Sequence, residues 1–391
     1  MGVSIRGWRK TLIIALFILP TILGVTLLSL YPIGYNIFIS LTNRSRFYMQ
    51  APANIWECVP KTPRFYCWNE PLLGNYIELF GPLLEGAALL AWLRFGLLFL
   101  PLIITNWLVS RTKKQSLSPP DTWWWWLVSM AASVAMWYVA DVQGALNVLM
   151  RANDFFVVMF RTCLYVAACI PLFFIVGLII ALILNNDEIK NKGAWRTLLI
   201  FPWAVPSYIT ALIWQFFFRT EQGLFNQVLR SVGVANPPAW LQVDVWAFAA
   251  VVIINLWLSY PFFMTIILGA LQSIPADQYE AADVDGATWW QKLKNITLPL
   301  LRPAVMPAIV LSSISTFQMF NTVYLVTDGG PIRGAGQPGA TEFVMIYGYK
   351  TLLRGDRYAD AGAFAMVIFI LLFAATLFSL RMTRITKGAY E

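Results

Sequence analysis

The stretch 280–299, EAADVDGATWWQKLKNITLP, carries the most informative spacing of charged, small and turn-forming residues in this chain. Glu280 is followed by two alanines. Three residues separate Ala282 from Gly286, and nine residues separate Gly286 from an Ile-x-Leu-Pro sequence at 296–299. Asp277 can cap a short helix, Gly286 can adopt a positive φ, and Thr288 can start a second short helix. The spacing predicts a helix–turn–helix elbow at a membrane surface, with alanines that permit close packing.

Residues suited to catalysis or to metal binding are scarce. The chain contains no histidine, which removes His-based triads, His zinc sites and a His proton relay. It also lacks the GxxxxGK[ST] loop that cradles phosphates, so we do not expect it to bind ATP by that route. We expect no catalytic residue, no metal site and no cofactor in this chain, and a membrane-embedded enzyme is disfavoured.

A second group of candidate residues interrupts two of the apolar runs. Four of them follow the spacing i, i+3, i+4 and i+7, which places them on one helical face, and three others surround Pro261, which can kink a helix and free a carbonyl. Hydroxyl, amide and aromatic groups suit a neutral, polyhydroxylated substrate, although Ser and Thr could instead bond helix to helix. The candidate substrate-binding residues are Ser259, Tyr260, Phe263, Ser312, Ser315, Thr316, Gln318, Met319 and Asn321.

The elements that must position these residues are long apolar segments. The chain is 59% hydrophobic and 12% charged, whereas soluble domains carry about 25% charged residues. A helix needs about 20 apolar residues to span a bilayer, and helices satisfy their own backbone groups in lipid. We therefore predict an all-α integral membrane protein with eight spans, near 11–32, 84–109, 122–141, 160–184, 197–217, 246–270, 303–326 and 359–380.

The distribution of basic residues predicts the orientation of these spans. Three Lys or Arg residues lie in each of five segments, the N-terminus, three connections and the C-terminal tail, which makes 15 of the 28 in the chain. Such an excess marks the cytoplasmic side, so both termini are expected there. The net charge of +8 is read in the same way, and not as a sign of nucleic-acid binding. The first run is too long for a signal peptide and is expected to remain as a helix.

The 280–299 stretch resembles the EAA motif of ABC importer permeases at each defining position. The resemblance extends to YPIGYNIFISLTN at 31–43, GAWRTLLIFPWAVP at 193–206 and ITLPLLRP at 296–303. FNTVYLVTDGGP at 320–331 is similar to a segment of the sugar-importing branch, in particular the subunits akin to the larger maltose permease. Together the similar segments cover residues 11–43 and about 155–385.

The resemblance implies a type I ABC importer transmembrane domain in a prokaryotic inner membrane. Its substrate would be a sugar or polyol, such as maltose, trehalose, an oligosaccharide or a glycerol-phosphate-like compound, delivered by an extracellular solute-binding protein. ATP and Mg would act on two copies of a cytoplasmic ATPase, beside a second permease subunit, and no nucleic acid is involved. In this family the elbow is the coupling helix that contacts the ATPase. The matching residues here are Glu280, Ala281, Ala282, Asp285, Gly286, Ile296, Leu298 and Pro299.

This sequence departs from the family pattern by an insertion. The family commonly has six core spans, and here 84–141 adds two spans, so that core orientation is preserved. Arg94, inside the first inserted span, either marks a function or snorkels to the interface, and we favour snorkelling. The expected division is 1–43 with the first span, 44–83 as an external loop, 84–158 as the insertion, and 159–391 as the core with the EAA loop 275–303.

Two questions stay open at this level. An ion-coupled secondary transporter or channel is the alternative function, but it would need buried carboxylates, and charges are nearly absent from the core spans. Cys58 and Cys67 share one loop, and the sequence leaves open whether they form a disulfide. Cys163 and Cys169 lie in an apolar run and are expected to act as small hydrophobic residues.

Overall fold

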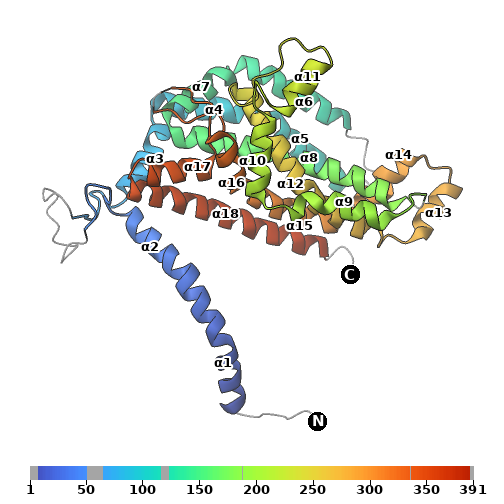
Figure 1. The fold of residues 1–391 in the computed structure, drawn as a ribbon, viewed down its shortest axis with the longest axis horizontal. Coiled ribbons are helices and arrows are strands. Elements are labelled where there is room, and N and C mark those ends of the chain that lie inside the picture. The colour runs from blue at the N-terminus through green and yellow to red at the C-terminus, as the bar shows by residue number, and fades with distance from the viewer. Residues whose placement is uncertain (1–7, 51–64, 116–122, 187, 335, 388–391) are drawn as a thin grey trace. The chain divides into compact units, whose positions relative to one another are not determined.

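The computed structural model describes residues 8–50, 65–115, 123–186, 188–334 and 336–387. The regular elements in these ranges are helices, and three isolated β-bridges lie within 42–68 (Figure 1). The predicted all-α class is confirmed. The helices are α1 (Trp8–Val25), α2 (Tyr31–Ser40), α3 (Gly74–Leu84), α4 (Gly86–Leu97), α5 (Leu100–Gln115), α6 (Trp123–Val139), α7 (Val142–Ala152), α8 (Asp154–Asn185), α9 (Lys192–Ala204), α10 (Ser207–Phe217), α11 (Leu224–Ser231), α12 (Asp244–Leu271), α13 (Ala276–Val284), α14 (Trp289–Lys292), α15 (Leu298–Phe317), α16 (Asn321–Thr327), α17 (Val344–Leu353) and α18 (Tyr358–Lys387), with π-helical turns at Thr26–Leu30 and Leu293–Thr297.

Six helical segments are long and apolar enough to cross a membrane, and two bent pairs raise the number to eight. All eight correspond to predicted runs. The continuous ones are Ile14–Ser40, Gly86–Thr112, Asp154–Asn185, Asp244–Leu271, Trp289–Phe317 and Tyr358–Ser379, and the bent pairs are α6 with α7 and α9 with α10. Some helices extend beyond the apolar runs, and α8 does so with a polar cap. At the start of α8, the Asn153 side chain accepts a hydrogen bond of 2.7 Å from Phe155 N.

The bends have local causes in the sequence. α9 and α10 meet at 89°, where Val205 precedes Pro206 and takes an extended conformation with φ −83° and ψ 130°, as residues before proline prefer. α6 and α7 meet at 64°, beside Asp141 with its left-handed φ of 46°. The run predicted as one span at 303–326 is also divided, because α15 ends at Phe317 and α16 starts at Asn321.

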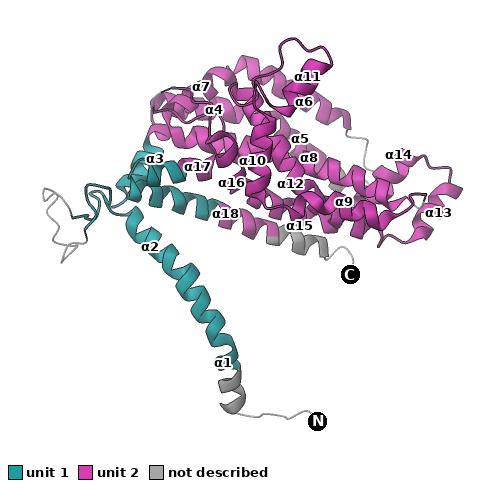
Figure 2. Ribbon diagram, viewed as in Figure 1, with its two compact units in different colours: residues 1–81, 348–371 teal, residues 82–347, 372–391 magenta. Residues whose placement is uncertain are grey.

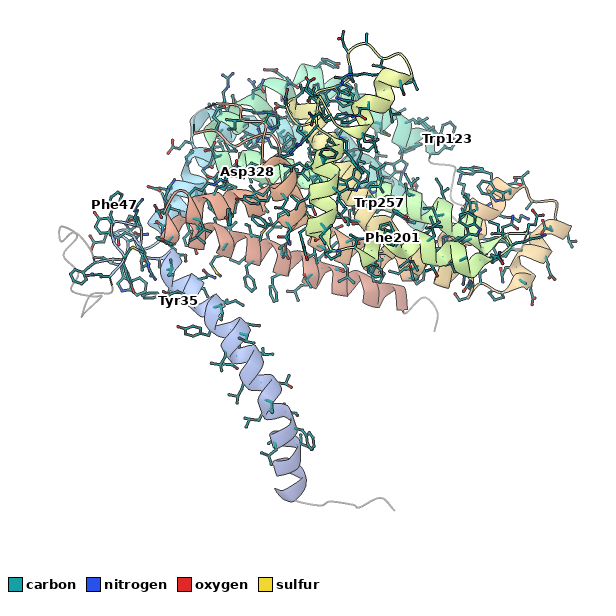
Figure 3. All side chains as sticks on the ribbon, viewed as in Figure 1. Tyr35, Phe47, Trp123, Phe201, Trp257 and Asp328 are labelled. Carbon is teal, nitrogen blue, oxygen red and sulfur yellow. The ribbon has the colours of Figure 1, made fainter. Side chains whose placement is uncertain are left out.

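The chain forms two compact units, residues 1–81 with 348–371 and residues 82–347 with 372–391 (Figure 2). No observation tests the four-part division expected from the sequence. In the first unit, the most apolar stretch of Ile14–Ser40 has no buried residue, and side chains such as Tyr35 project from the helix (Figure 3). Cys67 is disulfide-bonded, whereas Cys58, the partner that the sequence left open, lies outside the described residues.

The core of the second unit is the contact between α8 and α12. Tyr165 and Phe173 of α8 and Phe263 and Met264 of α12 are all buried there. Gly177 of α8 has no side chain, and this allows the two helices to approach closely at that position. α15 packs against both helices, and the short half-helices α10 and α16 pack against each other.

The inserted helices of the second unit pair with one another, α4 with α7 and α5 with α6. Arg94 of α4 forms an ion pair of 3.7 Å with Asp141, and its side chain is 42% exposed. The charge is therefore balanced by a carboxylate at the bend between α6 and α7. The ion pair gives Arg94 a structural role, so a charge at this position in the span does not require a role in transport.

Candidate functional site

The first arm of the predicted elbow is α13, which ends at a glycine turn. Gly286 has φ +71°, the left-handed conformation that glycine adopts without a steric penalty. Gly286 N donates to Asp283 O at 3.1 Å, and Ala287 N donates to Ala282 O at 2.9 Å. This pair of bonds is the Schellman arrangement, which satisfies the last carbonyls of a helix. Asp277 lies in the first turn of α13 and does not cap it, because Pro275 takes the N-cap position without a side-chain bond.

The second arm begins at Thr288, as predicted, with a reciprocal capping box. Thr288 N donates to Gln291 Oε1 at 2.7 Å, and Gln291 N donates to Thr288 Oγ1 at 3.4 Å. The helix does not stop after one turn, because a π-helical turn joins it to α15 without a break, giving one segment, Trp289–Phe317. Pro299 lies in the first turn of α15, where a missing N–H is tolerated.

Two side-chain contacts hold the arms together. Lys292 Nζ lies 2.6 Å from Asp283 Oδ1, and the hydroxyl groups of Tyr279 and Thr297 lie 3.0 Å apart. Both contacts connect α13 with the segment that follows the glycine turn. The elbow is therefore a defined unit that is joined directly to α15.

The residues predicted to couple the chain to a partner lie on the elbow surface. Glu280, Ala281, Asp285, Gly286 and Pro299 are exposed, whereas Ala282, Ile296 and Leu298 are half-buried. Sequence reasoning overlooked the most exposed apolar side chains, which are those of Val284 (89%), Trp289 (63%) and Trp290 (62%). The position of Val284 directly before the glycine turn was the available signal. The role in coupling of the eight residues predicted from the sequence stays a prediction.

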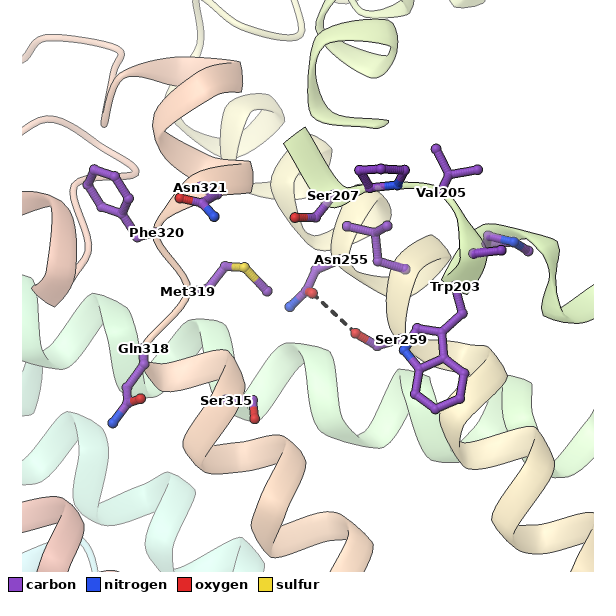
Figure 4. Close-up of a pocket in the computed structure, with 14 residues that line it drawn as sticks. Trp203, Val205, Ser207, Asn255, Ser259, Ser315, Gln318, Met319, Phe320 and Asn321 are labelled. Carbon is purple, nitrogen blue, oxygen red and sulfur yellow. Dashed lines mark hydrogen bonds between the residues drawn. The ribbon is translucent and has the colours of Figure 1, made fainter. Parts of the chain in front are cut away.

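A cavity of about 510 Å³ lies where the two broken helices meet α12 (Figure 4). Residues 202–207, at the break between α9 and α10, form one wall, and residues 318–321, between α15 and α16, form another. α12 contributes Asn255, Leu258 and Ser259, and α15 contributes Ser315. Helix breaks expose backbone polar groups, which are tolerated at membrane depth where they line a cavity.

Five of the nine candidate substrate-binding residues line this cavity. They are Ser259, Ser315, Gln318, Met319 and Asn321. The other four are absent from its lining. Tyr260 instead donates to Leu199 O at 3.0 Å, Phe263 is fully buried in the α8–α12 contact, Thr316 is buried at 3% exposure, and Ser312 is half-buried. Contact of any of the nine with a substrate stays a prediction.

Asn255 is a lining residue that sequence reasoning missed. Its side chain is fully buried. Its Oδ1 accepts a hydrogen bond of 3.2 Å from Ser259 Oγ, and its Nδ2 donates to Cys169 Sγ at 3.8 Å. The signal was present, because Asn255 is the sole amide side chain of α12 and lies one turn before Ser259.

Two charged residues are buried in the second unit, away from the cavity lining. Arg161 of α8 donates to Pro338 O at 3.2 Å and to Gly339 O, and Glu342 accepts a bond of 3.3 Å from Gly339 N. Arg161 therefore contacts the loop between α16 and α17, to which Glu342 belongs. No cluster of metal-ligating residues occurs in the described ranges of the chain.

An all-helical bundle of apolar spans, with a polar cavity between broken helices and an elbow between two spans, defines a membrane transport component. The sequence profile of the family described as "binding-protein-dependent transport system inner membrane component" matches residues 173–388, just over half of the chain. The chain belongs to this family, as the EAA-like spacing predicted, and is a multi-pass inner-membrane transport subunit.

Characterised relatives include the trehalose/maltose transport system permease protein MalF of Thermococcus litoralis, 35% identical over 239 residues, which are 61% of this chain and 78% of that protein. The galactooligosaccharides transport system permease protein GanP of Bacillus subtilis is 32% identical over 235 residues, 60% of this chain and 56% of GanP. The maltose/maltodextrin transport system permease protein MalF of Salmonella typhimurium is 36% identical over 237 residues, 59% of this chain and 46% of that protein. The chain thus spans about half the length of the latter two.

The fold also has a counterpart among solved structures. A chain of the bacterial alginate ABC transporter, in complex with an alginate pentasaccharide-bound periplasmic protein, superposes with a TM-score of 0.53. It is 23% identical, and the match covers 67% of this chain and 96% of that chain. This likeness supports the type I ABC importer fold.

Proposed function

We propose that this chain is a permease subunit of an ATP-driven ABC importer and that it carries a neutral saccharide through the cavity between its broken helices. One observation carries the proposal: the two spans that flank the elbow also line the cavity. α12 contributes Asn255 and Ser259 and leads into α13, and the segment that follows the elbow runs unbroken to Ser315. Movement of the elbow thus reaches the cavity through both of its neighbouring helices.

The composition of the cavity wall supports a neutral substrate. Its lining contains hydroxyl and amide side chains, the aromatic side chains of Trp203 and Phe320, and no charged side chain. Small-molecule sites combine apolar surface with a few polar groups that fix orientation. The named relatives carry trehalose, maltose, maltodextrin and galactooligosaccharides. A glycerol-phosphate-like substrate is less well matched, because the lining offers no Lys or Arg to a phosphate.

The partners follow from surfaces that this chain leaves open. The exposed elbow would dock on a cytoplasmic ATPase, present in two copies, where ATP and Mg would bind. The apolar segment Ile14–Ser40, which is unburied along its most apolar stretch, offers a helical face to a second permease subunit. An extracellular solute-binding protein would deliver the saccharide at the opposite side. Both termini would then be cytoplasmic, on the side of the elbow.

The test is reconstitution of the permease with its ATPase and binding protein in proteoliposomes. Glu280→Lys reverses the charge on the elbow, and we expect it to abolish saccharide uptake and the stimulation of ATPase activity by the loaded binding protein. Asp277→Lys is the matched control, because it reverses a charge in the first turn of the same helix. Uptake that follows an ion gradient without ATP would instead support an ion-coupled carrier.

A further inference from the structure

A second cavity, of about 250 Å³, lies at the far end of α10 from the first one. Ser207, the first residue of α10, lines the first cavity, whereas Phe218, directly after its last residue, lines the second. α10 has 11 residues, so at 1.5 Å per residue its two ends are about 16 Å apart. Leu241 and Gln242 complete the second cavity and directly precede α12. The second cavity therefore lies at the opposite end of α12 from the elbow.

The walls of this second cavity are held in place by one buried amide. Asn226 of α11 is fully buried, and its Nδ2 donates to Thr220 O and to Pro238 O, each at 3.0 Å. Its Oδ1 accepts a bond of 2.8 Å from Trp240 Nε1. Thr220 belongs to one wall, and Pro238 and Trp240 lead into the other, so this residue fixes the distance between the walls.

One wall of the second cavity is the turn at residues 220–222, and its backbone carbonyl groups already accept hydrogen bonds. Arg230 donates to Glu221 O at 3.1 Å and to Thr220 O at 3.3 Å, and Gln227 donates to Gln222 O at 3.1 Å. A Cβ at Gly223 would lie 2.2 Å from Arg219 O, so the turn has no room to relax at that position. The backbone is thus rigid before any ligand arrives, which lowers the entropic cost of binding.

The side chains around the cavity are, by contrast, free to bind. Within the part of the chain that the structure describes, no hydrogen bond or ion pair involves the side chains of Glu221, Gln222 or Gln242. With Arg219 and Thr220, these residues offer donors and acceptors in a lining with one positive and one negative group. Binding residues are often found on loops that a rigid scaffold holds in place.

We propose that this second cavity is an outer saccharide subsite, which binds the trailing sugar units of an oligosaccharide while its leading units enter the first cavity. Amides, a carboxylate and a guanidinium pair with sugar hydroxyls, which both donate and accept, and Leu241 supplies an apolar contact. A chain longer than a disaccharide is needed to reach from one cavity to the other. The inference rests on the proposed function, because it assumes that a saccharide moves through the first cavity.

The experiment uses the reconstituted complex of permease, ATPase and binding protein, with a maltose-series or galactooligosaccharide ladder as the probe, whichever the wild-type complex transports. Gln242→Ala combined with Gln222→Ala removes two amides from the rim. We expect the KM for the longer oligosaccharides to rise about tenfold, as for the loss of two hydrogen bonds, while the KM for the disaccharide stays unchanged. The matched control is Gln143→Ala, which removes an exposed amide on α7, outside the cavity.

A second variant separates ligand binding from protein docking. Gln242→Trp fills the cavity without altering Asn226, and the affinity of the complex for the loaded binding protein is measured alongside uptake. Equal changes for short and long saccharides, together with weaker binding-protein affinity, would assign the cavity to protein docking and overturn the subsite. Unchanged KM values at every chain length would overturn it as well, and the proposed function would stand, because disaccharide uptake tests that function separately.

Discussion

Gly177 of α8 lies against Phe263 of α12 so closely that a Cβ atom at Gly177 would be 2.6 Å from the Cβ of Phe263. It would also lie 2.9 Å from Met264 N, so backbone and not only side chain is in the way. Small residues allow membrane helices to approach and gain packing energy, since lipid supplies little hydrophobic drive between helices. This contact explains why Phe263, a candidate substrate residue, is buried between helices and does not reach the cavity.

The α8–α12 contact predicts the effect of adding one methyl group. Gly177→Ala should destabilise the protein by about 1–3 kcal/mol, because overpacking forces the helices apart. Gly269→Ala, in the last turn of α12, is the matched control, since its new Cβ would meet no atom within 4 Å. Thermal unfolding in detergent, followed by tryptophan fluorescence, measures the difference. Equal melting temperatures for the two variants would contradict the close approach.

The glycine turn of the elbow predicts a graded series. Gly286 has a φ of +71°, and a Cβ atom added there would meet no atom within 4 Å. The cost of a substitution therefore lies in the backbone conformation alone. Gly286→Val should cost about 1–2 kcal/mol locally and uncouple ATP hydrolysis from uptake, as should Gly286→Asp to a lesser degree. Asn tolerates the left-handed region better than other residues, so Gly286→Asn should retain most coupling.

The measurement for this series is the ratio of saccharide taken up to ATP hydrolysed in proteoliposomes. Co-purification of the ATPase provides the second readout, because a distorted elbow should dock more weakly. If Val and Asn variants behave alike, the turn conformation is not what coupling requires.

The elbow could be predicted from the sequence because its geometry is local. Gly286 and Thr288 act within four residues of their hydrogen-bond partners, so spacing alone indicates the turn and the cap. The contact of Gly177 with Phe263 joins residues far apart in the chain, and no pattern in one sequence predicts it. The family resemblance added the class of protein, and the spans followed from length and hydropathy.

The candidate substrate face was predicted only in part, for a physical reason. Helical periodicity places Ser312 and Ser315 on one face, but it does not say which side of that face meets a cavity. The break after Phe317 brings Gln318 and Met319 into the cavity lining. The helix α16 that follows the break packs against α10, and periodicity does not encode this packing. Asn255 was missed because hydroxyl spacing received more weight than the sole amide in an apolar helix.

The position of Asn255 predicts a selective loss of transport. Asn255→Leu keeps the number and branching of the side-chain heavy atoms but removes the acceptor of the Ser259 hydroxyl and the amide in the cavity wall. We expect the KM for saccharide uptake to rise about tenfold, for a loss near 1–1.5 kcal/mol, with folding retained. Asn295→Leu, on the surface of the π-helical turn, is the control. A wild-type KM in Asn255→Leu would show that the cavity wall does not bind the hydroxyl groups of the saccharide.

The two serines of α15 give a further test of the cavity. Ser315→Trp should block uptake because Ser315 lines the cavity, whereas Ser312→Trp should leave uptake nearly unchanged because Ser312 does not. Thr316→Trp should reduce folded yield, since Thr316 is buried and a larger side chain overpacks the site. Uptake and folded yield are measured for each variant. If Ser312→Trp and Thr316→Trp blocked uptake at normal yield, the whole face predicted from periodicity would contact the substrate.

The buried guanidinium of Arg161 predicts a coupled pair of substitutions. It donates to the carbonyls of Pro338 and Gly339 and interacts electrostatically with Glu342, which is itself buried. Arg161→Met should destabilise the protein by about 1–3 kcal/mol, because it leaves the carbonyl groups of Pro338 and Gly339 without their donor and removes a cation near the buried charge of Glu342. Glu342→Gln added to Arg161→Met should recover part of this loss, since the second change removes the charge of Glu342.

A double-mutant cycle of thermal unfolding measures the interaction between Arg161 and Glu342. Arg151→Met, which removes an exposed guanidinium on α7, is the control. Strictly additive losses in the cycle would show that the two buried charges do not depend on each other.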